Sequence, residues 1–412
     1  MAVVRPFKCI RPAVDKAELV AALPYDVYNR AEATEAVQGN DYSFLRIDRA
    51  ETSLPEYVDT YDPLVYKHAK KLFQARMDDG TFISDPDNCY YVYELIMNGR
   101  HQTGITACCS IDDYVNNVIK KHENTVEAKE YDRINHVDTL SAHTGPIFLA
   151  YRSNEIISAV VNKVKEGETL YSFTSDDGIT HNVWKIADAD DINTIRTEFE
   201  KINSIYIADG HHRCASAVKA GLKRRDLNPE YTGEEEFNFF LSVLFPEDQL
   251  MIMPYNRVVS DLNDLTEEEL LESITGFFIV RPMDGPFSPS RKYTFAMLLG
   301  GKWYELEAKD FIKRVTDPVK KLDVSILQTY LLDPVLGIKD PRKDKRIAFI
   351  GGIRGIKELE RRCKRDMKVA FAMYPTSIQE LFAVADEGRL MPPKSTWFEP
   401  KLRSGMFIHC IK

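Results

Sequence analysis

The sequence predicts a protein that mixes helices and strands, of either the α/β or the α+β class. A short apolar segment at 204–208 is followed by a glycine loop and a helix-forming segment, which is the strand, loop and helix order of α/β folds. Asn98-Gly99 separates two strand-like segments at 89–97 and 102–110, and both of its positions favour the positive φ angles of a tight hairpin turn. Segment 62–79 has the apolar spacing of an amphipathic helix.

The first 260 residues contain further elements in chain order. Weak alternation at 2–10 predicts an edge strand, and segment 111–121 is either helical or extended. The other expected helices are 16–23, 126–138, 156–165, 190–202 and 214–220, the last closed by Gly221, and the other expected strands are 146–151 and 183–186. The apolar segments 237–245 and 250–259 are expected to pair with each other across an intervening loop.

A second lobe is expected to begin near residue 261, so that 1–260 forms an N-terminal lobe and 261–412 a C-terminal α/β lobe. Thr266 is suited to cap a helix at 266–274, because glutamates follow it at the positive end of the helix dipole. A hairpin is expected around Gly300-Gly301. The remaining expected helices are 323–332, 356–365 and 378–387, and the remaining expected strands are 346–350, 369–374 and 406–411.

Composition and charge exclude several classes of function. The formal net charge of -9 argues against a protein that mainly neutralises a nucleic-acid backbone. No segment approaches the run of about 18 apolar residues that a membrane helix needs, and the N-terminus has no signal-peptide pattern, so a cytoplasmic protein is expected. The seven cysteines are odd in number and never spaced as CxxC, which favours reduced, mostly buried thiols.

The loop Asp209-Gly210-His211-His212-Arg213 is the most specific candidate site. It joins a predicted strand to a predicted helix, where the free N–H groups and the dipole of the first helical turn favour an anion. Gly210 permits close backbone approach, and the guanidinium of Arg213 has a fork of donors that matches phosphate oxygens. The alternative is a surface turn whose two histidines are incidental.

A second candidate lies in the segment from Lys120 to Thr125, followed by Lys129 and Arg133. The segment does not contain the zinc motif HExxH, because Val126 occupies the place of the second histidine. A carboxylate among lysine and histidine, here Glu123, can instead serve as a base for a hydroxyl group. The alternative is a charged helix face with pairs at i, i+4 spacing.

A third basic group lies near the C-terminus. Lys394-Ser395-Thr396, with Lys401, Arg403 and Ser404, could form a second phosphate clamp, because ammonium groups and hydroxyls in a proline-fixed loop can meet a polyanion. It is not a P-loop, since Pro392-Pro393 stands where that motif needs other residues. Packing of this loop beneath the fold is an equal alternative.

The segments His122-Glu123-Asn124-Thr125 and Asp209-Gly210-His211-His212-Arg213 resemble those of free serine kinases and their relatives in the superfamily shared with ParB and sulfiredoxin. The resemblance implies a ParB/sulfiredoxin-like core at about 100–250, with Glu123 deprotonating the serine hydroxyl. Asp209 and His211 would act with Glu123 in catalysis. The residues expected to bind substrate or phosphate are His122, Thr125, Lys129, Arg133, Gly210, His212, Arg213, Lys394, Ser395, Thr396 and Lys401.

Three further segments, 24–27, 254–257 and 391–401, resemble the longer, pyrophosphate-dependent branch of these kinases. The resemblance implies transfer of a phosphoryl group from pyrophosphate to free L-serine, with Mg²⁺ held by Asp209 and the donor phosphates. L-Serine and pyrophosphate are then the expected partners, and neither nucleic acid nor a membrane is expected. The alternatives are an ADP- or ATP-dependent serine kinase, a ParB-like phosphate- or nucleotide-binding regulator without catalysis, and a phosphohydrolase.

Overall fold

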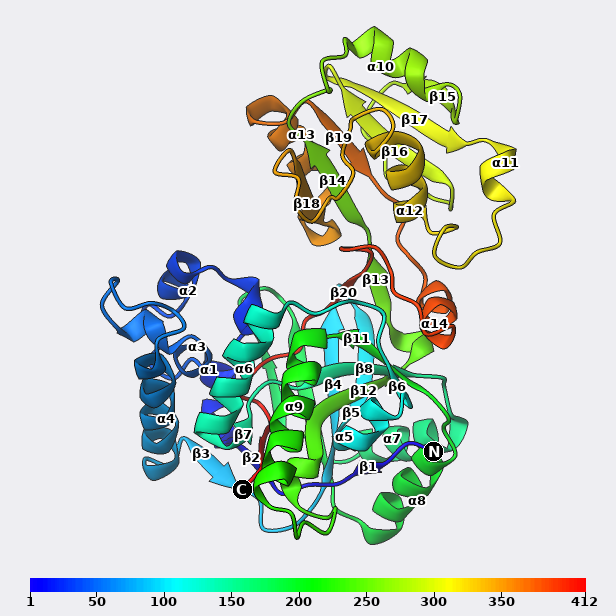
Figure 1. Cartoon of the computed structure of the whole chain (residues 1–412). Helices are drawn as coiled ribbons and strands as arrows, with labels where there is room; N and C mark the ends of the chain where they lie inside the picture. Colours follow the sequence, from blue (N-terminus) through cyan, green and yellow to red (C-terminus); the bar gives the residue numbers. More distant parts are fainter. The chain divides into compact units, whose positions relative to one another are not determined.

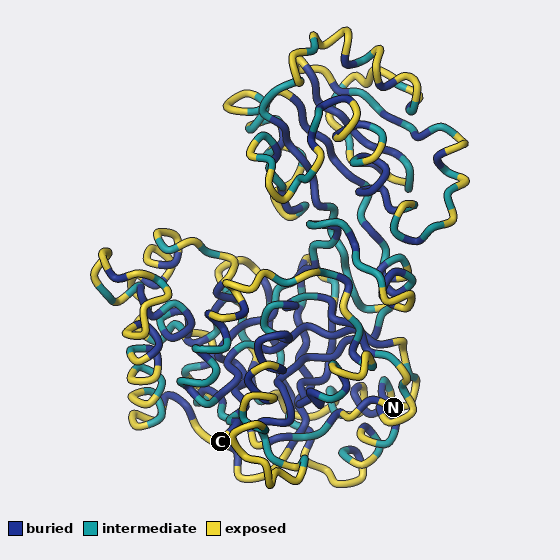
Figure 2. Tube along the Cα trace, in the orientation of Figure 1, coloured by how far each residue is buried: buried dark blue, intermediate teal, exposed yellow.

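The computed structural model describes residues 1–412, which divide into two units. Unit 1 contains Met1–Leu250 and Pro400–Lys412, and unit 2 contains Met251–Glu399. The sequence predicts one boundary at 260, whereas the chain leaves unit 1 at Leu250 and returns to it at Pro400. Each unit has its own sheet and its own buried interior (Figure 1 and Figure 2).

Unit 1 is built on a nine-stranded mixed sheet. Its order is β6-β11-β8-β12-β5-β4-β10-β9, and β1 pairs with β5. The pairs β11–β6 and β12–β8 are parallel and the others antiparallel. The strands are β1 Val4–Arg5, β4 Tyr90–Met97, β5 Arg100–Ser110, β6 Ile119–Lys120, β8 Ile147–Tyr151, β9 Tyr171–Thr174, β10 Thr180–Ile186, β11 Ile205–Asp209 and β12 Phe239–Pro246. The predicted mixed α/β class is confirmed.

The hairpin of β4 and β5 forms where the sequence predicts it. Met97 pairs with Arg100, so Asn98 and Gly99 make a two-residue turn with φ angles of 52° and 76°. Two positive φ angles define the type I′ turn, whose twist matches that of the flanking strands. The local signal was sufficient because turn and strands are adjacent in the chain.

Unit 1 has a helix at each segment where the sequence predicts one, together with two short helices at 30–36 and 45–48 that it does not predict. The longer helices are α4 Pro63–Asp78, α6 Glu127–Leu140, α7 Glu155–Lys165, α8 Ala189–Glu200 and α9 His211–Leu227, and the shorter ones are α1 Ala17–Val20, α2 Arg30–Ala36, α3 Leu45–Asp48 and α5 Ile111–Val115. Asp62 caps α4 by accepting the N–H of Leu64 at 2.8 Å, and Pro63 occupies the first helical position. Helices α6 and α9 lie side by side (Figure 1).

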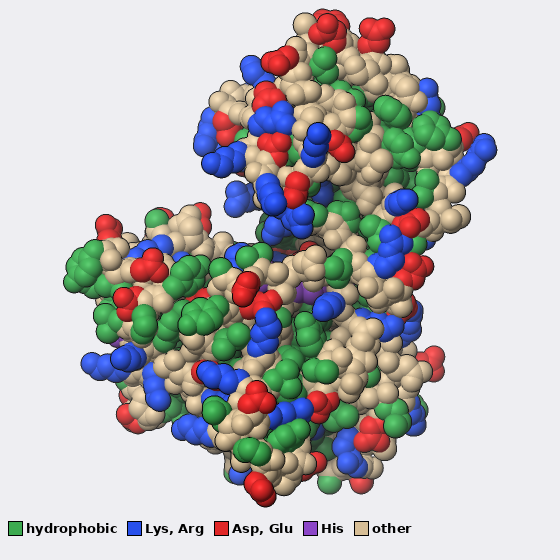
Figure 3. All heavy atoms as spheres, viewed as in Figure 1, with side chains coloured by type: hydrophobic (Ala, Val, Ile, Leu, Met, Phe, Trp, Pro, Cys, Tyr) green, Lys and Arg blue, Asp and Glu red, His purple; other side chains and the backbone are tan.

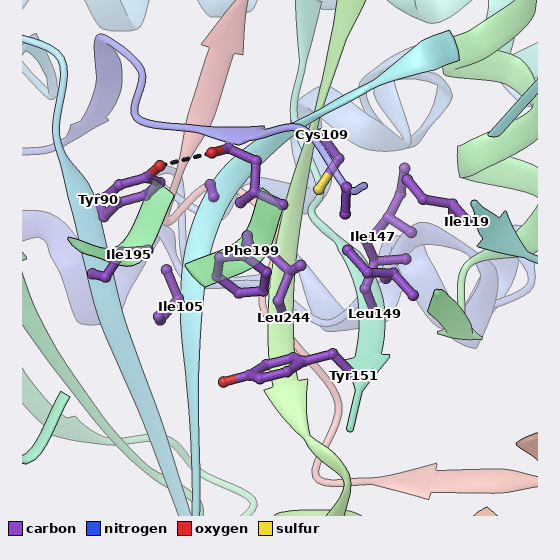
Figure 4. Packing of buried hydrophobic residues seen from close by; sticks show 14 of the residues in the cluster. Tyr90, Ile105, Cys109, Ile119, Ile147, Leu149, Tyr151, Ile195, Phe199 and Leu244 are labelled. Carbon is purple, nitrogen blue, oxygen red and sulfur yellow. Dashed lines mark hydrogen bonds between the residues drawn. The ribbon is translucent and has the colours of Figure 1, made fainter. Parts of the chain in front are cut away.

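The main core of unit 1 joins side chains of α7, α8 and α9 to the strands of the sheet. Figure 4 shows Phe199 of α8 close to Tyr151 of β8, and the centroids of the two rings are 5.1 Å apart. A hydroxyl within this core is satisfied, since Tyr90 donates to the carbonyl of Val4 at 2.8 Å. Burial of side chains of this size stabilises the fold by about 2–3 kcal/mol each, which fixes β11 and α9 relative to each other.

Helix α9 corrects the prediction that Gly221 closes a helix at 214–220. The helix runs on to Leu227, and Gly221 is buried within it. A Cβ at this position would lie 2.4 Å from the carbonyl oxygen of Phe237 and 2.9 Å from the side chain of Ile111. Gly221 therefore allows α9 to pack closely against its neighbours, and the helix continues past it.

The predicted pairing of 237–245 with 250–259 is wrong. Strand β12 lies between β5 and β8 in unit 1, with all of its residues buried. The following segment forms β13 Met251–Met253, which pairs with β20 Trp397–Glu399, and β14 Tyr255–Val259, which joins the sheet of unit 2. Two apolar segments close in sequence can each find a better partner far along the chain, and periodicity alone does not identify that partner.

Unit 2 has a six-stranded antiparallel sheet in the order β15-β17-β16-β19-β14-β18. Its other strands are β15 Phe278–Met283, β16 Thr294–Leu299, β17 Lys302–Ala308, β18 Ile347–Gly351 and β19 Val369–Ala372. Its helices are α10 Glu267–Ile274, α11 Asp310–Lys313, α12 Asp323–Leu327 with a π-helical continuation to Leu332, α13 Gly355–Arg365 and α14 Ile378–Asp386. Thr266 and Glu269 form a capping box at α10, which confirms the predicted cap.

A four-stranded sheet in unit 1, β3-β2-β21-β7, holds the C-terminal segment. Its strands are β2 Cys9–Pro12, β3 Phe82–Ser84, β7 Ala142–His143 and β21 Ile408–Cys410. Because β21 pairs with β2 and β7, residues 400–412 are anchored in unit 1. Basic and acidic side chains are interspersed over the visible surface (Figure 3), and no helix has both the length and the apolar character to cross a bilayer.

Candidate active site

The candidate site is built where β11 ends and α9 begins. Gly210 joins the two elements with φ 89° and ψ 33°, a left-handed conformation that glycine adopts without steric cost. A Cβ at Gly210 would also lie 3.1 Å from Nε and Nη2 of Arg213. Gly210 thus permits both the sharp turn and the close approach of a guanidinium to the loop backbone. The predicted strand, loop and helix are confirmed here.

Asp209 is the ionised acid of this loop. Its Oδ1 accepts the N–H of Gly210 at 2.8 Å and its Oδ2 accepts from Nζ of Lys401 at 2.9 Å. Burial by itself would raise the pKa of Asp209, but the charges of Lys401 and Arg213 outweigh it and hold the pKa well below its usual range. The ion pair fixes Lys401 beside the loop, and one third of the Asp209 side chain stays exposed.

Arg213 lies beneath the loop with hydrogen-bonding capacity to spare. Its Nη1 donates to the carbonyl of Pro146 at 2.7 Å, whereas its buried Nε has no hydrogen-bond partner. A buried donor without an acceptor costs about 1–3 kcal/mol. An anion at the N-terminus of α9 would meet this guanidinium together with the free N–H groups of the first helical turn.

His211 and His122 form a buried pair that positions Glu123. The two imidazole rings meet edge to face, with centroids 4.4 Å apart. Nε2 of His211 accepts the backbone N–H of His122 at 3.4 Å, which places the proton of a neutral His211 on Nδ1. That Nδ1 lies 3.8 Å from Oε2 of Glu123. The carboxylate of Glu123 is one third exposed and so combines a buried anchor with access to substrate.

Both histidines of this pair are neutral at pH 7. Burial lowers the pKa of His122 to about 4, opposed only in part by the carbonyl of Ile207 and the charge of Asp209. Burial also lowers the pKa of His211 well below its usual value, and the neighbouring His122 adds to this effect. A neutral His211 that accepts at Nε2 carries its hydrogen on Nδ1, the ring nitrogen that faces Glu123 at 3.8 Å.

His212 holds the same segment at a second point. Its Nε2 accepts the backbone N–H of Val126 at 2.9 Å. Thr125 hydrogen-bonds through its side chain to Glu130, which also pairs with Lys219 of α9. The two histidines of the loop therefore bind the backbone on either side of Glu123, and this arrangement sets the position of the carboxylate.

Arg133 and Lys129 lie on α6 and line small pockets of unit 1. Arg133 is buried, pairs with Asp132 at 2.7 Å and lies over the ring of Tyr25 at 3.9 Å. It lines two pockets, of about 130 and 30 Å³; Lys129 shares the larger one and Arg213 the smaller one. Since Asp132 already neutralises its charge, Arg133 has a structural partner here, and phosphate binding by Arg133 or Lys129 stays a prediction.

The C-terminal basic group is divided between the units. Lys401 belongs to unit 1 and contacts Asp209. Lys394, Ser395 and Thr396 belong to unit 2. There Ser395 is buried and donates to the carbonyl of Pro392 at 2.6 Å, and Nζ of Lys394 lies 5.5 Å from the ring centre of Tyr255. Packing of the proline loop within unit 2 thus accounts for Ser395.

Arg403, the other cation predicted for the clamp, is buried in unit 1 and is bound to Asp177, Ser175 and His181. Its donors are therefore directed to protein acceptors. Ser404 exchanges backbone hydrogen bonds with Ala22, and it lines the smaller pocket together with Arg213. Of these two residues, only Ser404 lies near a side chain of the 209–213 loop.

Asp209 is the residue that would hold a divalent cation. The chain has no cluster of three or more His, Cys, Asp or Glu side chains of the kind that forms a complete protein cage for a metal. Mg²⁺ in phosphoryl-transfer sites is commonly held by one or two carboxylates together with substrate phosphates and water. The ionised, partly exposed Asp209 fits that arrangement.

The sequence did not single out Ser216 and Glu130, which help to attach α6 to the site. Ser216 donates to the carbonyls of His212 and Glu130, and Lys219 pairs with the side chain of Glu130. His212, Ser216 and Lys219 are spaced four and three residues apart, so helical periodicity places them on one face of α9. Periodicity could have found that face, but not the helix that it meets.

Comparisons with known proteins give a family and a set of distant structures. A family model described as a protein of unknown function (DUF1015) matches residues 4–325. None of the curated proteins compared with the sequence matches it. A mutant free serine kinase in complex with AMP is 14% identical, with 73% of this chain and 92% of that chain covered and a TM-score of 0.34.

Two other solved structures are similar to the same extent. A conserved hypothetical protein from Pyrococcus furiosus is 14% identical, with 74% of this chain and 94% of that one covered and a TM-score of 0.35. SbnI from Staphylococcus aureus, truncated at its C-terminus, is 12% identical, with 72% and 85% covered and a TM-score of 0.36. These identities and scores are too low to carry a functional argument.

Proposed function

The chain belongs to the DUF1015 family of proteins of unknown function, and we propose that it is a phosphotransferase that makes O-phospho-L-serine from free L-serine with pyrophosphate as donor. The observation that carries the proposal is the carboxylate of Glu123, which is anchored 3.8 Å from Nδ1 of His211 at the start of α9. A candidate base and a candidate anion site are thereby joined in one structure.

Glu123 is proposed to accept the proton of the serine hydroxyl as the oxygen attacks phosphorus. A new bond forms between the serine oxygen and phosphorus, and the bond to the bridging oxygen of pyrophosphate breaks, releasing orthophosphate. Neutral His211 supports this role, because its Nδ1 lies 3.8 Å from the carboxylate and supplies no positive charge that would weaken the base. Positioning of this kind accounts for much of the rate in phosphoryl transfer.

The donor phosphates are proposed to lie against the first turn of α9. The free N–H groups of that turn, the guanidinium of Arg213 and the ammonium of Lys401 are the positive groups of the loop. Lys401 is held by Asp209 at 2.9 Å and can share its hydrogens with a phosphate oxygen. These groups would stabilise negative charge that shifts to the leaving phosphate.

Mg²⁺ is proposed to accompany the donor, with Asp209 as its protein ligand. The ion would supply neutralisation of phosphate charge. Asp209 is suited to hold it because the charges of Lys401 and Arg213 keep the pKa of its carboxyl well below the usual range, so that it is charged at pH 7. Lys401, which is bound to Oδ2 of Asp209, would then add positive charge toward the donor phosphates.

The proposal is tested by product analysis. The full-length protein is incubated with Mg²⁺ and L-serine, with pyrophosphate, ADP or ATP offered separately, and O-phosphoserine is measured by mass spectrometry. Glu127→Gln serves as the matched control for Glu123→Gln, because Glu127 is an exposed acid four residues further along the same segment. Phosphoserine from pyrophosphate with wild type and Glu127→Gln, and its loss with Glu123→Gln, are expected.

The other outcomes identify the alternatives. Phosphoserine from ADP or ATP alone would keep the serine kinase and change the donor. Orthophosphate release without phosphoserine would indicate a phosphohydrolase. No turnover with any donor, together with retained phosphate or nucleotide binding, would overturn the proposal in favour of a non-catalytic regulator.

A further inference from the structure

Unit 2 contains a pocket of its own, with a volume of about 350 Å³. It lies between β14, β18, the α12 helix with its π-helical end, and the loop that precedes β18. The volume is within the range of sites that bind small molecules. Its apolar walls include Leu332, Ile347, Phe349 and the Pro392-Pro393 pair. None of these residues belongs to the candidate active site.

Arg257 of β14 lines the pocket and has no carboxylate partner. It is 3% exposed, its Nη2 donates to the carbonyl of Lys394 at 3.0 Å, and its Nη1 donates to the carbonyl of Tyr255. Burial lowers the pKa of Arg257 to about 10, opposed only in part by Tyr255, and no carboxylate contributes. A guanidinium still carries its charge at pH 7 under these conditions, and a buried charge is ordinarily paired.

Two more cations stand on the loop at the edge of the pocket. Lys339 and Arg342 line it with Asp340, which accepts from Nε and Nη2 of Arg342 at 2.9 Å, so the net charge of +2 comes from Arg257 and Lys339. Arg346 holds this loop in place, since it binds Asp344 at 2.8 Å and the carbonyls of Leu336 and Gly337 at 3.1 and 3.2 Å. The cations are thus presented on an anchored loop.

We propose that this pocket binds a small phosphate monoester with a planar or apolar body. The net charge of +2 in the lining matches the charge of about −1.5 to −2 that a phosphate monoester carries at pH 7. Arg257 provides a guanidinium whose donors match phosphate oxygens, and its Cζ lies 5.4 Å from the ring centre of Phe349. The ester body would lie against Phe349 and the proline pair.

The inference is independent of the proposed function. All lining residues belong to unit 2, whereas Glu123, Asp209, His211 and Lys401 belong to unit 1. A binding measurement at this pocket needs no turnover. The failure of one proposal is therefore distinguishable from the failure of the other.

The experiment measures binding of AMP to the full-length protein by calorimetry, with inorganic phosphate and adenosine as probes of its two halves. Hydrogen exchange followed by mass spectrometry, read over residues 324–349, locates the binding within unit 2. The Lys339→Gln/Arg342→Gln variant removes the two exposed cations of the pocket. The matched control is Lys343→Gln/Lys345→Gln, which makes the same charge change at exposed positions of the same loop outside the lining.

AMP is expected to bind at least about tenfold more tightly than inorganic phosphate or adenosine alone, and to slow hydrogen exchange over residues 324–349. The Lys339→Gln/Arg342→Gln variant should weaken AMP at least about tenfold, whereas the control variant should not. Arg257→Lys, which keeps the charge and loses the fork, should also weaken AMP. Equal AMP affinity in both double variants, no slowing over 324–349, or no binding of AMP at millimolar concentration would each overturn the proposal.

Discussion

The two units differ in how they use buried ionisable groups. All nine histidines of the chain lie in unit 1 and none in unit 2. Six of the nine are buried, and burial lowers the pKa of each. The buried guanidinium groups of unit 1, among them Arg133 and Arg403, are paired with carboxylates, whereas Arg257 of unit 2 stays charged without a carboxylate partner. A neutral imidazole has one hydrogen-bond donor and one acceptor, so it can hold the segment that carries a catalytic base. A permanent positive charge is suited to binding an anion.

The largest expected effect is on turnover in unit 1. Glu123→Gln should lower kcat for phosphoserine formation by about 10³-fold, because a general base contributes about 10²–10⁴-fold to such a rate. The amide keeps the size of the side chain but cannot take a proton from serine. Steady-state kinetics measures the loss, and calorimetry should find AMP binding at unit 2 unchanged. A kcat within twofold of wild type would remove Glu123 from the role of base.

The histidines also predict that unit 1 is the acid-labile unit. An unfolded histidine binds a proton near pH 6.5, whereas buried His122 and His136 do so only near pH 4. The unfolded state therefore binds more protons between these values, and stability falls as the pH drops through 6.5 toward 4, by up to about 1.4 kcal/mol per histidine for each pH unit. Asp113 opposes this trend, since burial raises its pKa to about 6.

Urea unfolding between pH 7.5 and 5, read by pulse proteolysis with peptides of each unit quantified by mass spectrometry, measures this difference. The urea concentration at the midpoint of unfolding should decrease for unit 1 as the pH is lowered from 7.5 to 5. The midpoint for unit 2 should not decrease. Parallel loss of both midpoints would contradict the assignment of acid sensitivity to the histidines.

Gly210→Ala sharpens the account of the loop by comparison with a second glycine. Gly210 and Gly178 both have positive φ, 89° and 78°, but only at Gly210 would an added Cβ lie 3.1 Å from the guanidinium of Arg213. Both variants should lose about 1–2 kcal/mol of stability from backbone strain. Gly210→Ala alone should also lower kcat/KM, by about tenfold or more, because Arg213 must move. Equal kinetics for the two variants would show that the guanidinium contact is unimportant.

Asp323 gives unit 2 a smaller dependence on pH, of opposite sign. Its buried carboxylate accepts the N–H of Tyr293 at 3.0 and 3.1 Å, and burial raises its pKa to about 7. The folded state then binds more protons than the unfolded state between pH 4 and 7, so stability falls as the pH rises through this range. Asp323→Asn, whose carbonyl can still accept from Tyr293, should remove about 1–2 kcal/mol of that fall between pH 6 and 8. If the free energy of unfolding, measured with urea, depends on pH in the variant as it does in the wild type, this assignment to Asp323 is contradicted.

Local signals predicted much of the fold. The amphipathic helix α4, the type I′ hairpin and the Thr266 cap of α10 depend on residues within a few positions of one another, and all three form as expected. Non-local choices were not predictable in the same way. Gly221 lies within α9 because Phe237 and Ile111 pack against it, and β12 pairs with β5 and β8 rather than with the segment that follows.

The candidate site divides along the same line. The strand, glycine loop and helix around Gly210 could be predicted, because they are contiguous in sequence. The contacts of the two histidines could not, since His211 and His212 accept backbone N–H groups that lie 89 and 86 residues earlier in the chain. Backbone groups carry no sequence signature. The pairing of Lys401 with Asp209 likewise depends on the return of residues 400–412 to unit 1.

Phosphorus NMR of pyrophosphate with the wild-type protein and Mg²⁺, in the presence and absence of L-serine, tests whether Glu123 and the 209–213 loop carry out phosphoryl transfer. The account predicts that pyrophosphate is consumed only when L-serine is present, and that orthophosphate and a phosphate monoester appear in equal amounts. Pyrophosphate that persists with L-serine, or that decays equally without it, would contradict the assignment of Glu123 and the 209–213 loop to phosphoryl transfer.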